Sequence, residues 1–340
     1  MRWPPPAARW SNGPPADAAV STRRSGSAAR SLRAPDDAGA VEGLRTVVVA
    51  LAANVGIAAA KLIAALLTGS SAMLAEVFHS TADTGNQVLL LIANRRAGRP
   101  PDPGYPLGHG REAYFWALIA SLGMFFTGAL LSIREGISEL LHATPVASPV
   151  VAYAVLGVSL CLDGMSLARA YRQLRAEANT LDRAFLEHLD ITSDPVARAV
   201  FAEDAVSVAG NLIAGGGIAL HQLTGSAIPD AVAALVIGAC LGVVALDLAR
   251  RNRDFLVGRE AAPSIRARLS DLMARQDGVA RVGELLVTYV GPRRLWVVAR
   301  LDVDRRLDAL SIDGLLARVQ RSVHTEMPAV VRVDLTPHAI

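Results

Sequence analysis

The amino-acid sequence predicts an all-α bundle of six transmembrane helices, followed by a small cytoplasmic α+β domain with the element order αββαβ. Apolar residues make up 52% of the 340-residue chain, and they are concentrated between about residues 46 and 250. Within that stretch they form six runs of about 20 residues, the helix length that crosses a bilayer. Beyond residue 258 the runs become short, as in a small soluble sheet. Three parts are therefore expected, at residues 1–42, 43–257 and 258–340.

The first 42 residues are expected to form a disordered tail. They are rich in Pro, Ala, Ser, Arg and Gly, and such a segment cannot bury an apolar core. They lack the continuous apolar stretch of a secretory signal. Their arginines resemble those of a transit peptide, but the prolines at positions 4–6 and three aspartates argue against one. A solvated cytoplasmic tail is the favoured interpretation.

The six apolar runs are predicted to be helices because lipid offers no hydrogen-bond partner to an open backbone. They cover about residues 46–67, 72–95, 112–133, 148–172, 197–221 and 230–250. The two cysteines, Cys161 and Cys240, lie inside these runs without a CxxC partner. We interpret them as small buried apolar side chains rather than disulfide or zinc-finger residues.

The distribution of arginine predicts the orientation of the bundle. Residues 68–71, 138–149 and 222–229, which connect helices on one side, contain no Lys or Arg. The segments on the opposite side carry sixteen arginines: Arg23, Arg24, Arg30, Arg33, Arg45, Arg95, Arg96, Arg99, Arg111, Arg169, Arg172, Arg175, Arg183, Arg250, Arg251 and Arg253. The positive-inside rule therefore places both termini in the cytoplasm. These arginines flank apolar runs, so the net charge of +3 does not indicate a nucleic-acid partner.

The residues after 258 predict a small sheet with helices on one face. Helices are expected at 262–275 and 310–324, and strands at 282–290, 295–303 and 329–335. A Gly-Pro turn at 291–292 separates the first two strands.

Two ionisable residues stand out in the second predicted helix. His79 and Asp83 are four residues apart, so their side chains share one helical face. A charge at membrane depth costs roughly 2.5–3.5 kcal/mol and is a functional candidate by default. An imidazole and a carboxylate from one helix supply half of a tetrahedral site for zinc. The alternative is a His–Asp hydrogen bond that only holds two helices together.

The fifth predicted helix carries the adjacent acids Glu203 and Asp204. Consecutive helical residues point about 100° apart, so the two carboxylates do not face one point equally. Asp204 is the better ligand candidate, with Glu203 as a second ligand, a proton carrier or an outer-shell group. The alternative is that both acids lie nearer the cytoplasmic surface, because Asp194 and Pro195 begin this helix shortly before them.

Four further polar residues are candidates for supporting roles: Asn54, Lys61, Asn86 and Asp163. Lys61 either pairs with an acid or extends toward the outer interface. Asn86, with its neighbour Gln87, either orients the ligands or packs between helices. Asp163 interrupts an apolar run, and no role is assigned to it.

The remaining histidines are interpreted as exposed or loop residues: His109, His142, His188, His221, His324 and His338. His109 lies in a turn-rich loop between the second and third predicted helices. That loop is suited to guiding ions toward the cytoplasmic entrance.

Three stretches of sequence resemble a known family. Residues 67–76 read LTGSSAMLAE, residues 79–87 read HSTADTGNQ, and residues 110–116 read GREAYFW. Together with six helices and an intramembrane acid in the fifth, they resemble the cation diffusion facilitator family, in its zinc transporter 9-like branch with bacterial relatives. The resemblance covers about residues 43–340.

The resemblance implies proton-coupled antiport of zinc by alternating access, usually in a homodimer. In the family, two ligands come from the second helix and two from the fifth, the latter commonly as HxxxD. His79 and Asp83 match the first pair and Asp204 matches the final acid. Val200 stands at the fourth position and cannot bind metal, so Glu203 is the candidate replacement.

The resemblance also extends to the last 83 residues, where 289–296 (YVGPRRLW) matches the family's hairpin. Many relatives bind regulatory zinc there through several histidines, whereas this segment has only His324 and His338. We predict a dimerising domain without a well-formed zinc cluster.

The predicted function is export of divalent metal, zinc first, from the cytoplasm by proton antiport. The expected setting is a bacterial inner membrane, with metal ion, protons, lipid and a second copy as partners and without a tightly bound cofactor. Manganese, iron and cobalt are alternative cargoes, because a carboxylate-rich site with one imidazole accepts several divalent ions. A membrane scaffold that does not transport is an alternative from another class, kept open by Val200. An enzyme is not expected, because the sequence has no HExxH motif.

Overall fold

The computed structural model describes residues 37–142, 149–180 and 184–339, with side chains described from residue 51 onward except at positions 53 and 180. Residues 1–36 of the predicted tail lie outside the described residues. Helix α1 begins at Asp37, before the predicted end of that tail.

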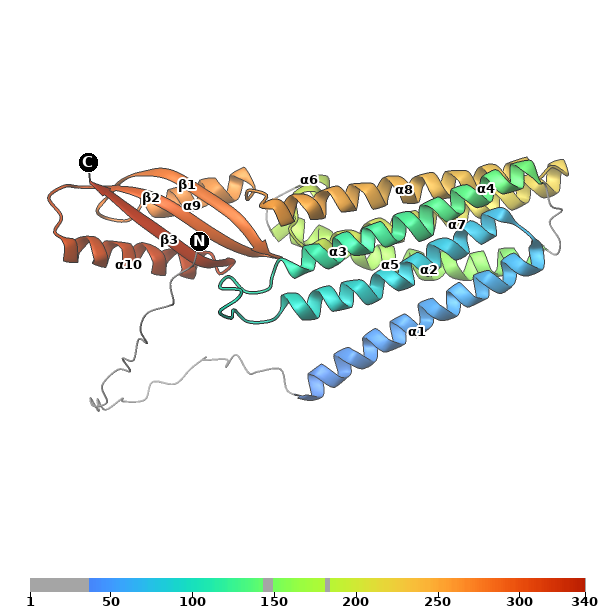
Figure 1. The fold of residues 1–340 in the computed structure, drawn as a ribbon, viewed down its shortest axis with the longest axis horizontal. Coiled ribbons are helices and arrows are strands. Elements are labelled where there is room, and N and C mark those ends of the chain that lie inside the picture. The colour runs from blue at the N-terminus through green and yellow to red at the C-terminus, as the bar shows by residue number, and fades with distance from the viewer. Residues whose placement is uncertain (1–36, 143–148, 181–183, 340) are drawn as a thin grey trace, which may run out of the picture. The chain divides into compact units, whose positions relative to one another are not determined.

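Six long helical segments coincide with the six predicted apolar runs (Figure 1). They are α1 (Asp37–Thr68), α2 (Ser71–Ala97), the continuous segment α3 (Glu112–Gly123), η1 (Met124–Leu130) and α4 (Leu131–Leu141), then α5 (Pro149–Thr180), α7 (Pro195–Thr224) and α8 (Ile228–Val257). Two local features were not predicted. The third run contains the π-helical segment η1, and a short helix, α6 (Phe185–Ile191), precedes α7.

Four helices in the described part of the chain are long and apolar enough to cross a membrane. They are Glu112–Leu141, Pro149–Asn179, Pro195–Thr224 and Ile228–Val257. In α1 the described apolar stretch, Asn54–Thr68, is shorter, and α2 carries too many polar residues to qualify by composition. The count of six spans therefore stays a prediction.

The ends of the helices follow from capping residues. Ser70 caps the start of α2, where its side chain accepts a hydrogen bond from the Met73 amide. Asp194 caps the start of α7 in the same way, through amides of that helix's own first turn, and Pro195 follows it. The end of α7 is Gly225, whose φ of 68° is a left-handed conformation that glycine adopts without strain.

A carboxylate from another helix also holds the start of α2. Asp230 of α8 is buried and accepts hydrogen bonds from the Ser70 hydroxyl at 2.8 Å and the Ser71 amide at 2.7 Å. An anion at a helix N-terminus meets unpaired N–H groups and the positive end of the helix dipole. Asp230 therefore joins α2 to α8 at this end of the bundle.

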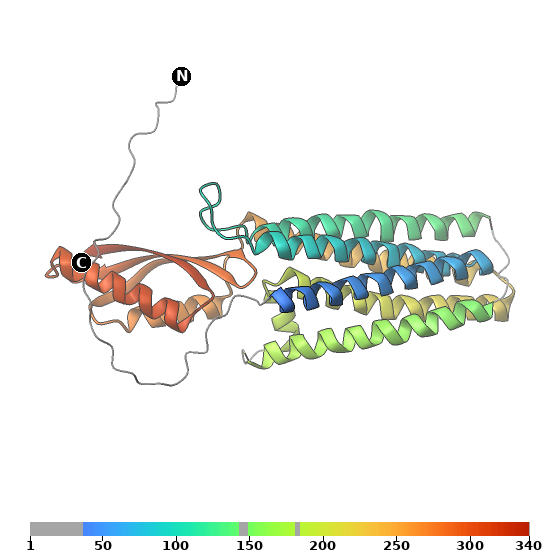
Figure 2. The same cartoon turned by 90° about the horizontal axis from the view of Figure 1, so that it is seen from below.

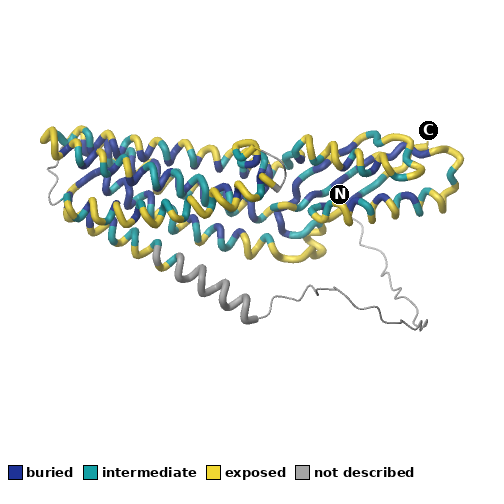
Figure 3. The backbone as a smooth tube through the Cα atoms, turned by 180° about the vertical axis from the view of Figure 1, so that it is seen from behind, coloured by how far each residue is buried: buried dark blue, intermediate teal, exposed yellow. Residues whose placement is uncertain are grey.

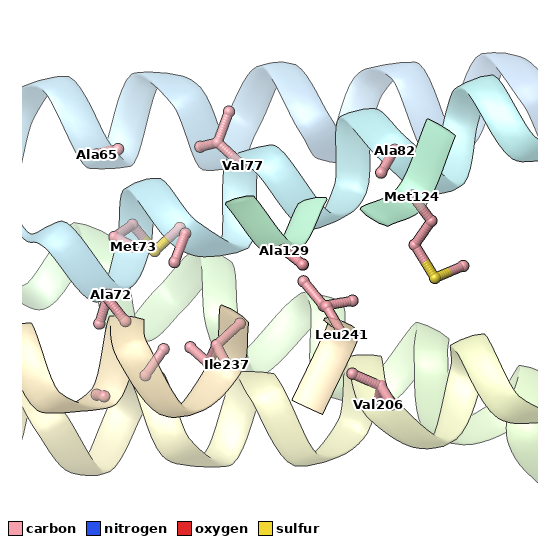
Figure 4. Close-up of a cluster of buried hydrophobic side chains, with 14 of the residues drawn as sticks. Ala65, Ala72, Met73, Val77, Ala82, Met124, Ala129, Val206, Ile237 and Leu241 are labelled. Atoms are coloured by element: carbon pink, nitrogen blue, oxygen red, sulfur yellow. The ribbon is translucent and has the colours of Figure 1, made fainter. Parts of the chain in front are cut away.

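The core of the bundle consists largely of small residues, which let helices approach closely. In Figure 4, Met73 of α2, Ala129 of η1, and Ile237 and Leu241 of α8 lie between these helices. A Cβ added at Gly217 would lie 2.6 Å from the Ala233 Cβ, so a larger residue there would push α7 away from α8. Figure 2 shows the long helices of the bundle side by side.

The outward faces of the bundle helices are apolar. Large aliphatic side chains on them are strongly exposed, among them Leu66, Leu67, Val150, Leu223 and Val243. Figure 3 shows exposed and buried positions recurring along each helix. Cys161 is also exposed and Cys240 is half-buried, so the prediction that both cysteines are buried is wrong for Cys161. An outward apolar surface on this scale suits lipid.

The residues after 258 form the predicted αββαβ order. The elements are α9 (Pro263–Ala274), β1 (Val279–Gly291), β2 (Arg294–Val303), α10 (Ala309–Glu326) and β3 (Val330–Ala339). The sheet order is β1-β2-β3, with β1 antiparallel to β2 and β2 parallel to β3. Leu269 and Met273 of α9 and Val319 of α10 join buried strand residues in one core, so both helices cover the same face.

Candidate metal site

The polar face of α2 is the starting point of the site. His79 is completely buried, and its Nε2 lies 3.3 Å from Asp83 Oδ2. Glu76 stands one turn before His79 and Asn86 nearly one turn after Asp83. Helical geometry at these spacings places all four on one side of α2.

Helix α7 presents a matching polar face. The Ser207 hydroxyl lies 3.3 Å from His79 Nε2 and 3.4 Å from Asp83 Oδ2. Glu203, which is buried, accepts a hydrogen bond from the Asn86 side-chain amide. The structure thus joins α2 to α7 through three polar contacts, two made by Ser207 and one by Glu203.

A cavity of about 590 Å³ lies against these helices. Five acids contribute to its wall: Asp83 of α2, Asp163 of α5, Asp194 at the start of α7, and Glu203 and Asp204 of α7. Asn54, Gln87, Ser207 and Val200 also line it, whereas His79 lies behind the wall. The predicted carboxylates therefore share one space, with the imidazole adjacent to it.

The predicted ligands do not form a closed coordination sphere. Among the described residues, no three His, Cys, Asp or Glu side chains are close enough together to hold a metal ion. Asp83 Oδ1 and Asp204 Oδ2 are buried atoms without a hydrogen-bond partner among the described residues. Buried anionic oxygens are costly unless paired, so this wall favours a cation.

The supporting residues have specific partners. Lys61 is buried and forms an ion pair of 2.7 Å with Glu76. It therefore pairs with an acid and does not extend toward the outer interface. Asp163 accepts a hydrogen bond of 2.8 Å from the Asn211 side-chain amide. Asn86 of α2 donates a hydrogen bond to a candidate ligand, Glu203 of α7.

Three residues at the site were missed from the sequence: Glu76, Ser207 and Asn211. A positional signal existed for two of them. Glu76 precedes His79 by three residues, and Ser207 follows Glu203 by four, so each shares a face with a candidate ligand. Asn211 continues the Ser207 face one turn later, but an isolated asparagine in a helix gives no functional signal.

The expectation that the other histidines are exposed or lie in loops holds for some of them only. It holds for His142, His324 and His338, which are exposed, and for His109, which is buried but lies in a loop; it is wrong for His188 of α6 and His221 of α7, which are buried in helices. His109 Nε2 lies 2.8 Å from Asp102 Oδ2 in the loop between α2 and α3. This hydrogen bond holds the pKa of Asp102 below its ordinary value.

Comparison with known proteins identifies the family. The model of the cation efflux transmembrane domain matches residues 47–257. The mitochondrial proton-coupled zinc antiporter SLC30A9 of Xenopus laevis is 34% identical over 247 residues, which are 73% of this chain and 44% of that protein. Metal tolerance protein C4 of Arabidopsis thaliana is 29% identical over 71% of this chain and 52% of that protein. The chain spans about half the length of these relatives.

Among solved structures, a nickel form of the C-terminal domain of MamM, carrying a single substitution, matches at a TM-score of 0.23 and 20% identity, over 23% of this chain and 99% of that one. The family match and the apolar helices make the protein an integral membrane protein, classed with transporters rather than enzymes. The chain belongs to the cation efflux, or cation diffusion facilitator, family, in its zinc transporter 9-like branch.

Proposed function

We propose that the protein is a secondary active transporter that exports divalent metal, zinc first, from the cytoplasm in exchange for protons. The main support is the cavity whose wall carries Asp83, Glu203 and Asp204, with His79 adjacent. A space with several carboxylates in its wall, within helices that present apolar faces outward, suits passage of a small cation.

The ligand roles follow from position. Asp83 and Asp204 meet the ion first, because each offers an unpartnered oxygen near the cavity. His79 joins through Nε2, which already lies beside Asp83. Glu203 or a water completes the shell in place of the residue missing at Val200. Since the ligands are not yet gathered, binding requires their side chains on α2 and α7 to converge on the ion.

Proton coupling follows from ligand chemistry. Carboxylates and imidazole bind metal only when deprotonated, so metal and protons compete for the same groups. Protons entering from outside displace the metal after the bundle opens outward. An inward proton gradient then drives metal out.

The setting of the transporter is part of the same proposal. We propose that both termini lie in the cytoplasm, which the arginine distribution supports, and that the membrane is of the bacterial inner type. Residues 43–257 act as the transmembrane domain, and residues 258–340 as a cytoplasmic domain that joins two copies. The tail at 1–42 is assigned no transport role.

Zinc uptake into everted vesicles under a pH gradient tests the proposal. Asp83→Asn removes a charged cavity ligand and is expected to reduce uptake to background. Asp247→Asn is the matched control, because Asp247 is an exposed aspartate of α8 paired with Arg251, outside the cavity. Full transport by Asp83→Asn would refute the site. Absence of metal-dependent uptake by the wild-type protein would favour the scaffold alternative.

A further inference from the structure

The lysine of the chain forms a buried ion pair beside the candidate metal ligand His79. Lys61 of α1 and Glu76 of α2 are 1% and 0% exposed, and Lys61 Nζ lies 2.7 Å from Glu76 Oε2. Burial of an ion pair is unfavourable unless its remaining hydrogen-bonding atoms also find partners. The second carboxylate oxygen of Glu76, Oε1, therefore also needs a partner.

The second oxygen of Glu76 faces the candidate metal ligand. Glu76 Oε1 lies 3.8 Å from His79 Nδ1, just beyond hydrogen-bond distance. Both are buried atoms without a hydrogen-bond partner among the described residues. These two buried atoms are of complementary character, and a small turn of the imidazole would bring them within hydrogen-bond distance.

The surrounding backbone holds the Glu76 carboxylate in this place. Gly210 of α7 packs against it, and a Cβ at that position would overlap Glu76 Oε1. With Lys61 on one side and α7 on the other, the carboxylate has little freedom to turn away from His79.

This arrangement determines which nitrogen of His79 is offered to a metal. An imidazole that donates its Nδ1–H keeps the lone pair of Nε2 for coordination. In this structure Nε2 is the nitrogen that lies beside Asp83 and Ser207. We propose that Glu76, held by Lys61, is a positioning residue that accepts the Nδ1–H of His79 and so directs Nε2 to the metal.

The proposal rests on the proposed function and makes a specific prediction for the neutral analogue. In Glu76→Gln, the amide oxygen turns to Lys61, which can only donate. The amide NH2 then faces His79 Nδ1 and opposes the protonated Nδ1 that metal binding through Nε2 requires. The double variant Lys61→Met/Glu76→Gln has no ammonium to bind the amide oxygen at position 76. That amide can therefore rotate, and its oxygen can again accept a hydrogen bond from the Nδ1–H of His79.

The test combines equilibrium zinc binding to the purified full-length protein with zinc uptake into everted vesicles. Loss of an outer-shell partner typically costs about 10–100-fold in metal affinity. Glu76→Gln is expected to weaken zinc binding, and to raise the zinc concentration at half-maximal uptake, by about this factor. The double variant is expected to recover most of the loss. Glu139→Gln, at a buried glutamate of α4 outside the cavity, is the matched control and is expected to match wild type.

The rescue separates positioning from a structural role, because two independent structural losses add. A double variant that binds zinc no better than Glu76→Gln would overturn the proposal, and so would unchanged affinity in Glu76→Gln. Thermal unfolding of each variant identifies any that fail to fold. If Glu76→Gln fails because Lys61 is left buried without a counter-charge, the double variant, which buries no charge at this pair, still tests the proposal. If wild-type vesicles transport no zinc, the proposed function fails, while the binding comparison still tests the role of Glu76.

Discussion

At the scale of single residues, Asp302 makes the stability of the sheet domain depend on pH. Asp302 of β2 is buried, and its carboxylate accepts a hydrogen bond of 2.9 Å from the guanidinium of Arg281 on β1, with His338 at 3.1 Å. The hydrogen bond from Arg281 holds the pKa of Asp302 below its ordinary value. A carboxyl group whose pKa is lower in the folded than in the unfolded protein stabilises the fold above its unfolded pKa. That contribution disappears as pH falls through the folded value.

We therefore expect the wild-type protein to lose stability as pH falls below about 4, the ordinary pKa of aspartate. Asp302→Asn should be less stable than wild type near neutral pH, and the difference should shrink in acid. Thermal unfolding of the full chain across pH measures both. Asp313→Asn on α10 is a control, since that side chain is exposed to solvent. A constant difference between Asp302→Asn and wild type at all pH values would contradict the prediction.

At the scale of elements, helix α2 depends on a neighbour for its first turn. The Asp230 carboxylate of α8 accepts hydrogen bonds from the hydroxyls of Ser70 and Ser71 and from the backbone amides of Ser71 and Ala72. Asp230→Asn keeps the shape of the side chain but turns an NH2 group toward these donors. A buried group that loses its partner costs about 1–3 kcal/mol, and more when it was charged.

We expect Asp230→Asn to lower the thermal stability of the purified protein measurably and to weaken zinc uptake in parallel, because α2 carries His79 and Asp83. The exposed Asp254→Asn near the other end of α8 serves as the comparison and should change neither. Normal unfolding with normal uptake in Asp230→Asn would show that the start of α2 is held by other contacts.

The elements themselves were largely predictable, and their contacts were not. Apolar runs of about 20 residues predicted the six helical segments, and a Gly-Pro turn between two short runs predicted the hairpin of β1 and β2. The π-helical segment η1 escaped prediction because its residues, such as Gly128 and Ala129, are as apolar as those of a regular helix. For the site, spacing placed His79 with Asp83 on one face. The pairing of Lys61 with Glu76 depends on how α1 packs against α2, which periodicity within one helix does not contain.

At the scale of the whole molecule, the composition of the site predicts its choice of cargo. Imidazole suits zinc, whereas an all-carboxylate set suits manganese and other hard cations. His79→Asp should therefore weaken zinc transport relative to manganese transport. Uptake of zinc in competition with manganese, iron and cobalt measures this change. His142→Asp, at an exposed histidine at the end of α4, should keep the wild-type preference. An unchanged order of preference in His79→Asp would exclude the imidazole from cargo selection.

The burial of Lys61 has a practical consequence for labelling chemistry. It is the sole lysine of the sequence, and in the folded protein its amine is buried and paired with Glu76. Acylating reagents that attack neutral, solvated amines thus find no lysine target on the native surface. The rate of acylation at Lys61 would therefore report how often helices α1 and α2 separate. Comparing this rate with and without metal would show whether metal binding changes that opening.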